Sequence, residues 1–258
     1  MRTIGADELA SETLVVLDYN DDVVANLLAT PTELHELILG HLVCEGYFPT
    51  HIEVKDCTFE AVEKSGSFYA KLSSQIKISR EGDSERLVTS SCGACNNEGL
   101  ELLISDLPIV TKDNSKVNFS ILNNCFKTMR ERQTGFHLTG GMHAAGLIDS
   151  QGHLLFISED IGRHNAVDKV VGKALITNTD LFNSTLILSG RCGWDIVAKA
   201  SRSGIANIAS IGACSSLAAK AARYTGIRII SFLKDNVDKW NKKNYFDTSA
   251  RYSKKNKS

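Results

Sequence analysis

The sequence predicts an α/β protein with a layered C-terminal domain at 113–258 and a smaller α+β domain at 1–112. After residue 154, apolar runs that suit strands alternate with three expected helices, at 163–174, 194–203 and 216–224. Strands that are apolar throughout are typical of a sheet covered on both faces, and strand–helix–strand repeats favour parallel pairing. We therefore expect the larger domain to contain a mainly parallel sheet between layers of helices.

Turn residues support this division into elements. Asn20-Asp21 and Ser65-Gly66 each separate two strand-like runs, and both pairs suit tight hairpin turns. Gly204 and Gly226 follow the last two expected helices, where a left-handed residue commonly ends a helix. The N-terminal domain is thus expected to be built from hairpins, and the C-terminal domain from repeated strand–helix units.

A helix is also expected directly after Thr30. Thr30 suits the cap position, Pro31 the first helical position and Glu33 the return contact of a capping box. Apolar residues then recur at helical spacing over 34–42.

Composition excludes several classes of function. The 258 residues carry a net charge of −1, which argues against a protein that coats nucleic acid or a membrane surface. The N-terminus is acidic and lacks a continuous apolar core, so no secretory signal is expected, and no apolar run is long enough for a membrane span. Seven cysteines, scattered except for one pair, suit free thiols in a reducing compartment. We expect a cytoplasmic protein.

Polar and glycine-rich segments follow the expected strands of the C-terminal domain. In open α/β sheets, ligands bind beyond the carboxyl ends of the strands, where helix N-termini offer free N–H groups. The segments at this predicted edge include Arg163 and His164, Gly190 and Arg191, Gly212, and Phe232, Leu233 and Lys234. Arginine side chains there suit a pyrophosphate or a guanine-type ligand. The alternative is that the glycines only permit tight turns and the arginines form surface ion pairs.

Cys92 and Cys95 form the one closely spaced cysteine pair, and they follow a polar segment at 80–91. Structural zinc requires four ligands, and no second pair of this kind exists. A thioredoxin-like pair follows a strand and opens a helix, and a zinc deaminase requires an H-x-E motif upstream of its cysteines. Neither pattern fits. The remaining chemistry is that of a mobile thiol, in sulfur transfer or in redox cycling.

Other side chains near the predicted edge are open to two interpretations. His143 follows two glycines, and it suits either ligand contact or the ordering of a tight turn. Cys192 and Cys214 are interpreted as small buried apolar residues rather than as a sulfur relay. Asp168 and Lys169 are expected to face solvent on their helix.

Five segments resemble the FdhD family, the accessory sulfurtransferases of formate dehydrogenase, and the resemblance covers nearly the whole chain. These segments are C-G-A-C at 92–95, F-H-L-T-G-G-M-H-A-A-G at 136–146, E-D-I-G-R-H-N-A-V-D-K-V-V-G at 159–172, L-S-G-R at 188–191 and T-G-I-R-I-I-S-F at 225–232. The resemblance implies a cytidine-deaminase-like, three-layer C-terminal domain without catalytic zinc, a smaller N-terminal domain and a homodimer. Two positions depart from the family pattern, Asn96 after the second cysteine and Lys234 in place of an arginine.

The resemblance also implies a reaction. Sulfur from a cysteine desulfurase would form a persulfide on Cys92, with Cys95 as its partner, and would pass to the molybdenum (or tungsten) bis(molybdopterin guanine dinucleotide) cofactor before that cofactor enters formate dehydrogenase. GDP would serve as an analogue of the bound cofactor. The residues expected to bind it are Phe232, Leu233, Lys234, Asp235, Asn236, Val237, Arg191, Gly190, Arg163, His164 and His143. The alternative is a chaperone that escorts the cofactor while the cysteines play a structural or redox-protective role.

Overall fold

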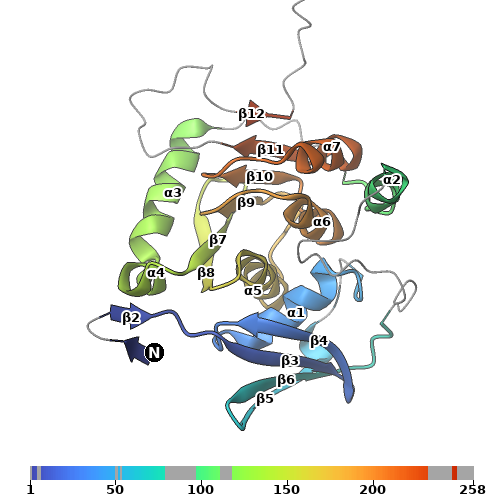
Figure 1. The fold of residues 1–258 in the computed structure, drawn as a ribbon. Coiled ribbons are helices and arrows are strands. Elements are labelled where there is room, and N and C mark those ends of the chain that lie inside the picture. Colours follow the sequence, from blue (N-terminus) through green and yellow to red (C-terminus); the bar gives the residue numbers. More distant parts are fainter. Residues whose placement is uncertain are drawn as a thin grey trace, which may run out of the picture.

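The computed structural model describes residues 2–4, 7–49, 52, 54–78, 97–110, 118–231 and 246–248. These residues form a six-stranded sheet, a four-stranded sheet and a short N-terminal ribbon (Figure 1). In spatial order, the larger sheet contains β12 (Phe246–Asp247), β11 (Arg228–Ser231), β10 (Asn207–Ser210), β9 (Thr185–Leu188), β7 (His143–Ile148) and β8 (Leu154–Asp160). The smaller sheet contains β4 (Asp22–Ala29), β3 (Thr13–Tyr19), β6 (Ser67–Ser73) and β5 (Thr58–Lys64), and the ribbon pairs β1 (Arg2–Ile4) with β2 (Asp7–Leu9).

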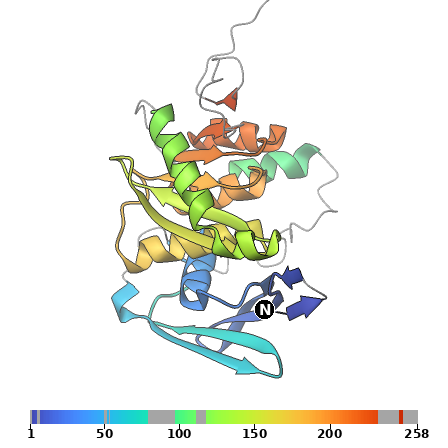
Figure 2. The same cartoon turned by 90° about the vertical axis from the view of Figure 1, so that its left-hand side faces the viewer.

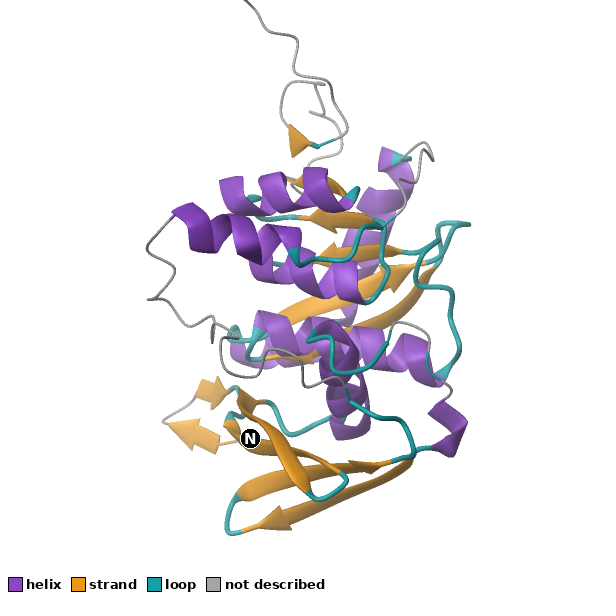
Figure 3. Cartoon of the chain, turned by 90° about the vertical axis from the view of Figure 1, so that its right-hand side faces the viewer, coloured by secondary structure: helices purple, strands orange, loops and turns teal. Residues whose placement is uncertain are grey.

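Helices cover both faces of the larger sheet (Figures 1 and 3). Ile187, Ala209 and Ile230 point to one face and pack against α3, whereas their neighbours Leu186 and Ile208 point to the other face. Figure 2 looks onto the face that α3 crosses. The helices and the single turn of 3-10 helix are α1 (Leu34–Cys44), η1 (Val54–Asp56), α2 (Asn97–Ser105), α3 (Phe119–Arg132), α4 (Thr134–Thr139), α5 (Arg163–Ile176), α6 (Trp194–Arg202) and α7 (Ser216–Thr225). The α/β class and the layering are as predicted.

The larger sheet is mixed, which corrects the prediction of a mainly parallel sheet. β9, β10 and β11 pair in parallel, but β7 pairs antiparallel with both β8 and β9, and β12 pairs antiparallel with β11. The short turn between β7 and β8 is the physical reason, because a connection of a few residues can join only antiparallel neighbours. β8 therefore runs in the same direction as β9, β10 and β11, and their carboxyl ends share one edge.

The second core joins α1 to the smaller sheet, and α1 in turn packs against α5. The predicted hairpin turns are confirmed, since Asn20 and Asp21 have φ values of 51° and 66°, and Ser65 and Gly66 have values of 56° and 80°. The predicted cap at Thr30 is wrong. Helix α1 begins later, after Glu33, because Thr30 is drawn into contacts with the start of α5.

The predicted domain boundary at 112 lies outside the described residues and stays a prediction. On its N-terminal side, Ile104, Leu107 and Val110 pack in the core of the larger sheet, next to α7. The Val110 amide also donates to the Thr225 carbonyl, 2.7 Å away. Among the described residues, no helix is long and apolar enough to cross a membrane.

Candidate functional site

The carboxyl ends of β8, β9, β10 and β11 and the amino end of β7 meet at one edge of the larger sheet. Four described segments leave this edge, at 160–164, 189–193, 211–215 and 142–143. We call it the strand-end edge. All five described residues that were predicted to bind ligand lie on it: His143, Arg163, His164, Gly190 and Arg191.

The turns after β9 and β10 remain hydrogen-bonded beyond the strands. The Gly212 amide donates to the Gly190 carbonyl at 3.1 Å, and a Cβ atom on Gly212 would lie 2.7 Å from that carbonyl oxygen. Position 212 therefore requires glycine, because any side chain would separate the two turns. Backbone from two successive turns is thus held side by side at the strand-end edge, with the exposed Arg191 beside it.

His143 lies next to these turns. A Cβ atom on Gly190 would be 3.4 Å from His143 Nδ1, so the imidazole lies against this turn. Burial lowers the pKa of His143, and the Arg163 and Arg191 guanidinium groups lower it further. The imidazole is therefore neutral at neutral pH, and the positive charge here is carried by the two arginines. This arrangement favours an anionic ligand.

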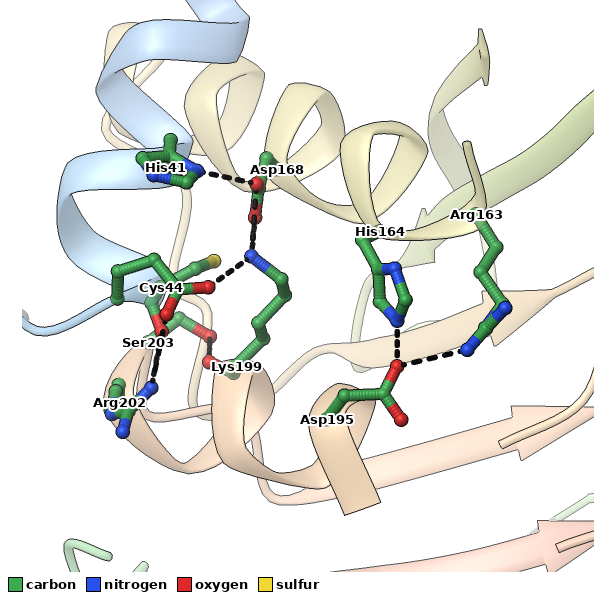
Figure 4. Close-up of polar contacts among 10 residues, drawn as sticks. His41, Cys44, Arg163, His164, Asp168, Asp195, Lys199, Arg202 and Ser203 are labelled. Carbon is green, nitrogen blue, oxygen red and sulfur yellow. Dashed lines mark hydrogen bonds and ion pairs between the residues drawn. The ribbon is translucent and has the colours of Figure 1, made fainter. Parts of the chain in front are cut away.

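Arg163 and His164 converge on the carboxylate of Asp195 (Figure 4). His164 Nε2 contacts Asp195 Oδ2, and Arg163 Nη2 lies 3.4 Å from the same oxygen. Burial lowers the pKa of His164, while the Asp195 carboxylate opposes that shift. Asp195 thus joins the start of α5 to the start of α6 and fixes both side chains. Sequence reasoning missed Asp195, although its position in the first turn after Ser189-Gly190-Arg191 was a usable signal.

A buried ion pair fixes the turn that precedes Arg163. Asp160 and Lys169 have fully buried side chains, and Lys169 Nζ lies 2.6 Å from Asp160 Oδ2. Asp160 Oδ1 accepts from the Gly162 amide at 2.8 Å and from the Asn165 side chain at 2.9 Å. Thr30, at the end of β4, donates its amide to Asp160 Oδ2 at 3.1 Å. The smaller sheet therefore positions the start of α5 directly.

A second buried group of charges centres on Asp168, the residue before Lys169 on α5. Lys199 Nζ contacts Asp168 Oδ1 at 2.7 Å and Glu45 Oε1 at 2.7 Å, and His41 Nδ1 lies 3.2 Å from Asp168 Oδ2. The side chain of Asp168 is only 1% exposed. Figure 4 shows His41, Asp168 and Lys199 meeting between α1, α5 and α6. The prediction that Asp168 and Lys169 face solvent is therefore wrong, because α1 covers the face of α5 that would otherwise be exposed.

Asp168 gives the stability of the protein a specific dependence on pH. Burial would raise the pKa of Asp168, but the Lys199 ammonium group and the hydrogen bond with His41 outweigh it and lower the pKa from 3.8 to about 2. A lowered pKa stabilises the fold above the unfolded value, and this contribution is lost as the pH falls through the folded value. The shift corresponds to about 2 kcal/mol, lost between about pH 4 and pH 2. We expect the stability gap between the wild type and Asp168→Asn, measured by urea unfolding, to narrow by this amount over that range.

The control is Asp21→Asn, since the Asp21 side chain is 94% exposed. Because this carboxylate is exposed, its removal should change the free energy of unfolding by at most about 1 kcal/mol at either pH. A constant gap for Asp168→Asn would contradict the assigned role of Asp168.

Glu159 connects two of the five segments singled out in the sequence, 136–146 and 159–172. Its carboxylate accepts from the Gly135 and Phe136 amides, each at 2.8 Å. These contacts hold the start of α4, which was not predicted, against the end of β8. The segments 136–146 and 159–172 are therefore joined at the strand-end edge.

A cavity of about 710 Å³ lies elsewhere, beside β8 and the start of α1. Its lining includes Glu33, Glu36, Phe156 and Lys173, and none of the predicted ligand-binding residues. Within the described part of the chain, no cluster of three or more His, Cys, Asp or Glu side chains is placed to hold a metal ion. The predicted catalytic residues Cys92 and Cys95, and the predicted ligand contacts at 232–237, lie outside the described residues.

Comparison with known proteins gives consistent matches. The model of the FdhD/NarQ family matches residues 10–251. A sulfur carrier protein FdhD of Saccharolobus solfataricus is 38% identical over 211 residues, which cover 81% of this chain and 78% of the relative. A sulfur carrier protein FdhD of Streptomyces coelicolor is 34% identical over 240 residues, covering 88% and 84%. In fold, the chain is similar to a crystal structure assigned as a formate dehydrogenase accessory protein of Desulfotalea psychrophila, with a TM-score of 0.67, 23% identity, and coverage of 95% and 90%.

Proposed function

This chain belongs to the FdhD/NarQ family, and we propose that it is a sulfur carrier required for formate dehydrogenase activity. The observation that carries the proposal is the match over most of the chain to relatives named as sulfur carrier proteins. The positively charged strand-end edge supports it, because a carrier of this kind must hold the anionic molecule that receives the sulfur.

In the proposed first step, sulfur arrives from a cysteine desulfurase. The Cys92 thiolate attacks the outer sulfur of the persulfide on the donor. A new S–S bond forms on Cys92, the S–S bond of the donor breaks, and the donor leaves as a thiolate that takes up a proton. No external oxidant is required, because the oxidised sulfur atom is transferred as such. Cys95 is proposed as the partner thiol of Cys92.

In the proposed second step, the outer sulfur passes as sulfide to the molybdenum bis(molybdopterin guanine dinucleotide) cofactor, which is the substrate. The Cys95 thiolate attacks Cys92 Sγ and the S–S bond of the Cys92 persulfide breaks. The two electrons that the sulfur gains come from formation of a Cys92–Cys95 disulfide, which a cellular dithiol then reduces.

The pyrophosphate groups of the cofactor suit Arg191 and Arg163, since guanidinium groups bind phosphate oxygens through paired hydrogen bonds. His143 and the facing backbone of Gly190 and Gly212 lie beside these arginines. The layered α/β domain also supports the proposal of a cytidine-deaminase-like fold without catalytic zinc. Formate dehydrogenase as the recipient, a homodimer and a cytoplasmic location complete the proposal.

The test is direct detection of the persulfide. The protein is incubated with a cysteine desulfurase and cysteine, and its peptides are analysed by mass spectrometry. We expect a gain of one sulfur atom on the peptide that contains Cys92, and we expect Cys92→Ala to abolish that gain while GDP binding is unchanged.

The matched control is Cys57→Ala, which removes a half-buried thiol just before β5 and should leave loading at Cys92 intact. Normal loading of Cys92→Ala would eliminate the mechanism. Absence of any gain in the wild type, with GDP still bound, would favour the cofactor chaperone instead.

A further inference from the structure

Cys192 and Cys214 lie opposite each other at the strand-end edge. They form a parallel bridge just beyond β9 and β10. The Cys192 amide donates to the Ala213 carbonyl at 3.1 Å, and the Ser215 amide donates to the Cys192 carbonyl at 3.1 Å. Residues paired in this way project their side chains to the same face of the ribbon. The two thiols are therefore neighbours.

The two thiols differ in exposure and in acidity. Cys192 is fully buried, whereas Cys214 is half-buried and packs on the edge of the main core. The hydrogen bond between the thiols raises the pKa of Cys192 well above its usual range, and burial acts in the same direction. The same hydrogen bond lowers the pKa of Cys214, with a further contribution from the charge of Arg223 and against the effect of burial. Cys214 is thus the more acidic and the more accessible of the two thiols, and its Sγ lies 3.3 Å from the Ser215 carbonyl oxygen.

From this geometry we infer that Cys214 is a second sulfur-accepting site, which takes the outer sulfur of a persulfide while Cys192 holds the acceptor in place. The Cys214 thiolate attacks the outer sulfur of R–S–S–H. The bond between Cys214 Sγ and that sulfur forms, the S–S bond of the donor breaks, and the product R–S⁻ takes the proton from the new persulfide. Sulfur is neither oxidised nor reduced overall.

The structure favours a persulfide over a Cys192–Cys214 disulfide as the product. Disulfide formation would require Cys192 to attack as a thiolate, and burial keeps Cys192 protonated. A thiol that stays protonated is a poor nucleophile but remains a hydrogen-bond donor. Cys192 therefore stabilises the sulfur on Cys214 instead of displacing it.

The proposed second site at Cys214 lies close to the proposed cofactor-binding residues. Cys214 is two residues from Gly212, whose backbone contacts Gly190 next to Arg191. A sulfur atom on Cys214 would stand beside the residues proposed to bind the cofactor. That the sulfur comes from a cysteine desulfurase rests on the proposed function. That the Cys214 thiol accepts sulfur from a persulfide does not depend on it.

The experiment removes Cys92 and Cys95, so that sulfur uptake at Cys214 is measured separately from the proposed uptake at Cys92. The full chain carrying Cys92→Ala and Cys95→Ala is treated with glutathione persulfide, remaining thiols are alkylated, and each cysteine peptide is analysed by mass spectrometry. We expect a gain of one sulfur atom on Cys214, at a rate at least about tenfold above that of Cys57, whose pKa is raised by burial.

A variant at Cys192 tests the hydrogen bond. Cys192→Ala should slow sulfur uptake at Cys214 by at least about threefold at pH 7 and move its pH profile upward, whereas Cys192→Ser, which keeps a donor, should restore part of the rate. Labelling of Cys57 and Cys214 at equal rates, or a Cys192–Cys214 disulfide as the main product, would overturn the inference. Neither of these results bears on the proposal that Cys92 accepts sulfur in the wild type, which is tested by its own experiment.

Discussion

Gly40→Ala should lower the free energy of unfolding by about 3 kcal/mol, even though alanine is the better helix former. Gly40 lies inside α1, where it meets α5, and a Cβ atom on Gly40 would stand 1.7 Å from the backbone oxygen of Asp168. Gly172 on α5 makes the reciprocal approach, since its Cβ would lie 2.0 Å from the Glu36 oxygen. The obstacle in both cases is backbone, which cannot rotate away. The two helices would have to separate.

Urea unfolding measures the change in the free energy of unfolding. Its sign distinguishes a steric clash between α1 and α5 from an effect of helix propensity. Helix propensity alone predicts that Gly40→Ala stabilises the protein by up to about 1 kcal/mol. The control is Gly66→Ala in the hairpin between β5 and β6, where φ is +80° and no atom lies within 4 Å of the new Cβ. That variant should lose only about 1–2 kcal/mol, from backbone strain. A Gly40→Ala protein as stable as the wild type would show that α1 and α5 do not meet as described.

Lys169→Met should destabilise the protein by about 3–5 kcal/mol, because it leaves the carboxylate of Asp160 buried without its cation. Both side chains are fully buried, and Lys169 Nζ also bonds the Thr30 carbonyl at 3.0 Å. Loss of the lysine would loosen the turn that leads to Arg163. Adding Asp160→Asn to this variant should recover part of the stability, since neither charge of this ion pair then remains.

Denaturant unfolding of the single and double variants measures both effects. The matched control is Lys220→Met, which removes an exposed lysine whose partner Glu101 is also exposed. An exposed pair of this kind contributes at most about 1 kcal/mol. Equal losses for Lys169→Met and Lys220→Met would contradict the role assigned to the buried pair.

Local patterns predicted much of the fold and the position of the strand-end edge. Helical spacing identified α5, α6 and α7 to within a few residues, and turn residues such as Asn20 and Asp21 located the hairpins. The strand-end edge followed from the alternation of strands and helices, because Arg163 and Arg191 each come directly after a strand. These features depend on neighbours in the chain, which a single sequence contains.

Contacts between distant segments could not be predicted in the same way. Thr30 looked like a helix cap, but it bonds Asp160, which lies 130 positions further along the chain. Asp168 and Lys169 looked exposed because nothing near them in the sequence indicates that α1 covers α5. Gly40 and Gly172 did carry a signal, since an isolated glycine inside a helical pattern often has a packing reason. The pairing of Cys192 with Cys214 depends on the register of two turns, which only the structure supplies.

The central claim is that the strand-end edge binds a guanine-nucleotide ligand through its arginines, and calorimetric titration with GDP tests it most directly. We predict that the wild type binds GDP, and that Arg191→Ala weakens binding by at least about tenfold, or about 1.4 kcal/mol, through loss of charge-assisted hydrogen bonds. Lys127→Ala, on the exposed side of α3, should bind as the wild type does. If the wild type did not bind GDP, or if Arg191→Ala bound it equally well, the edge would not be the ligand site.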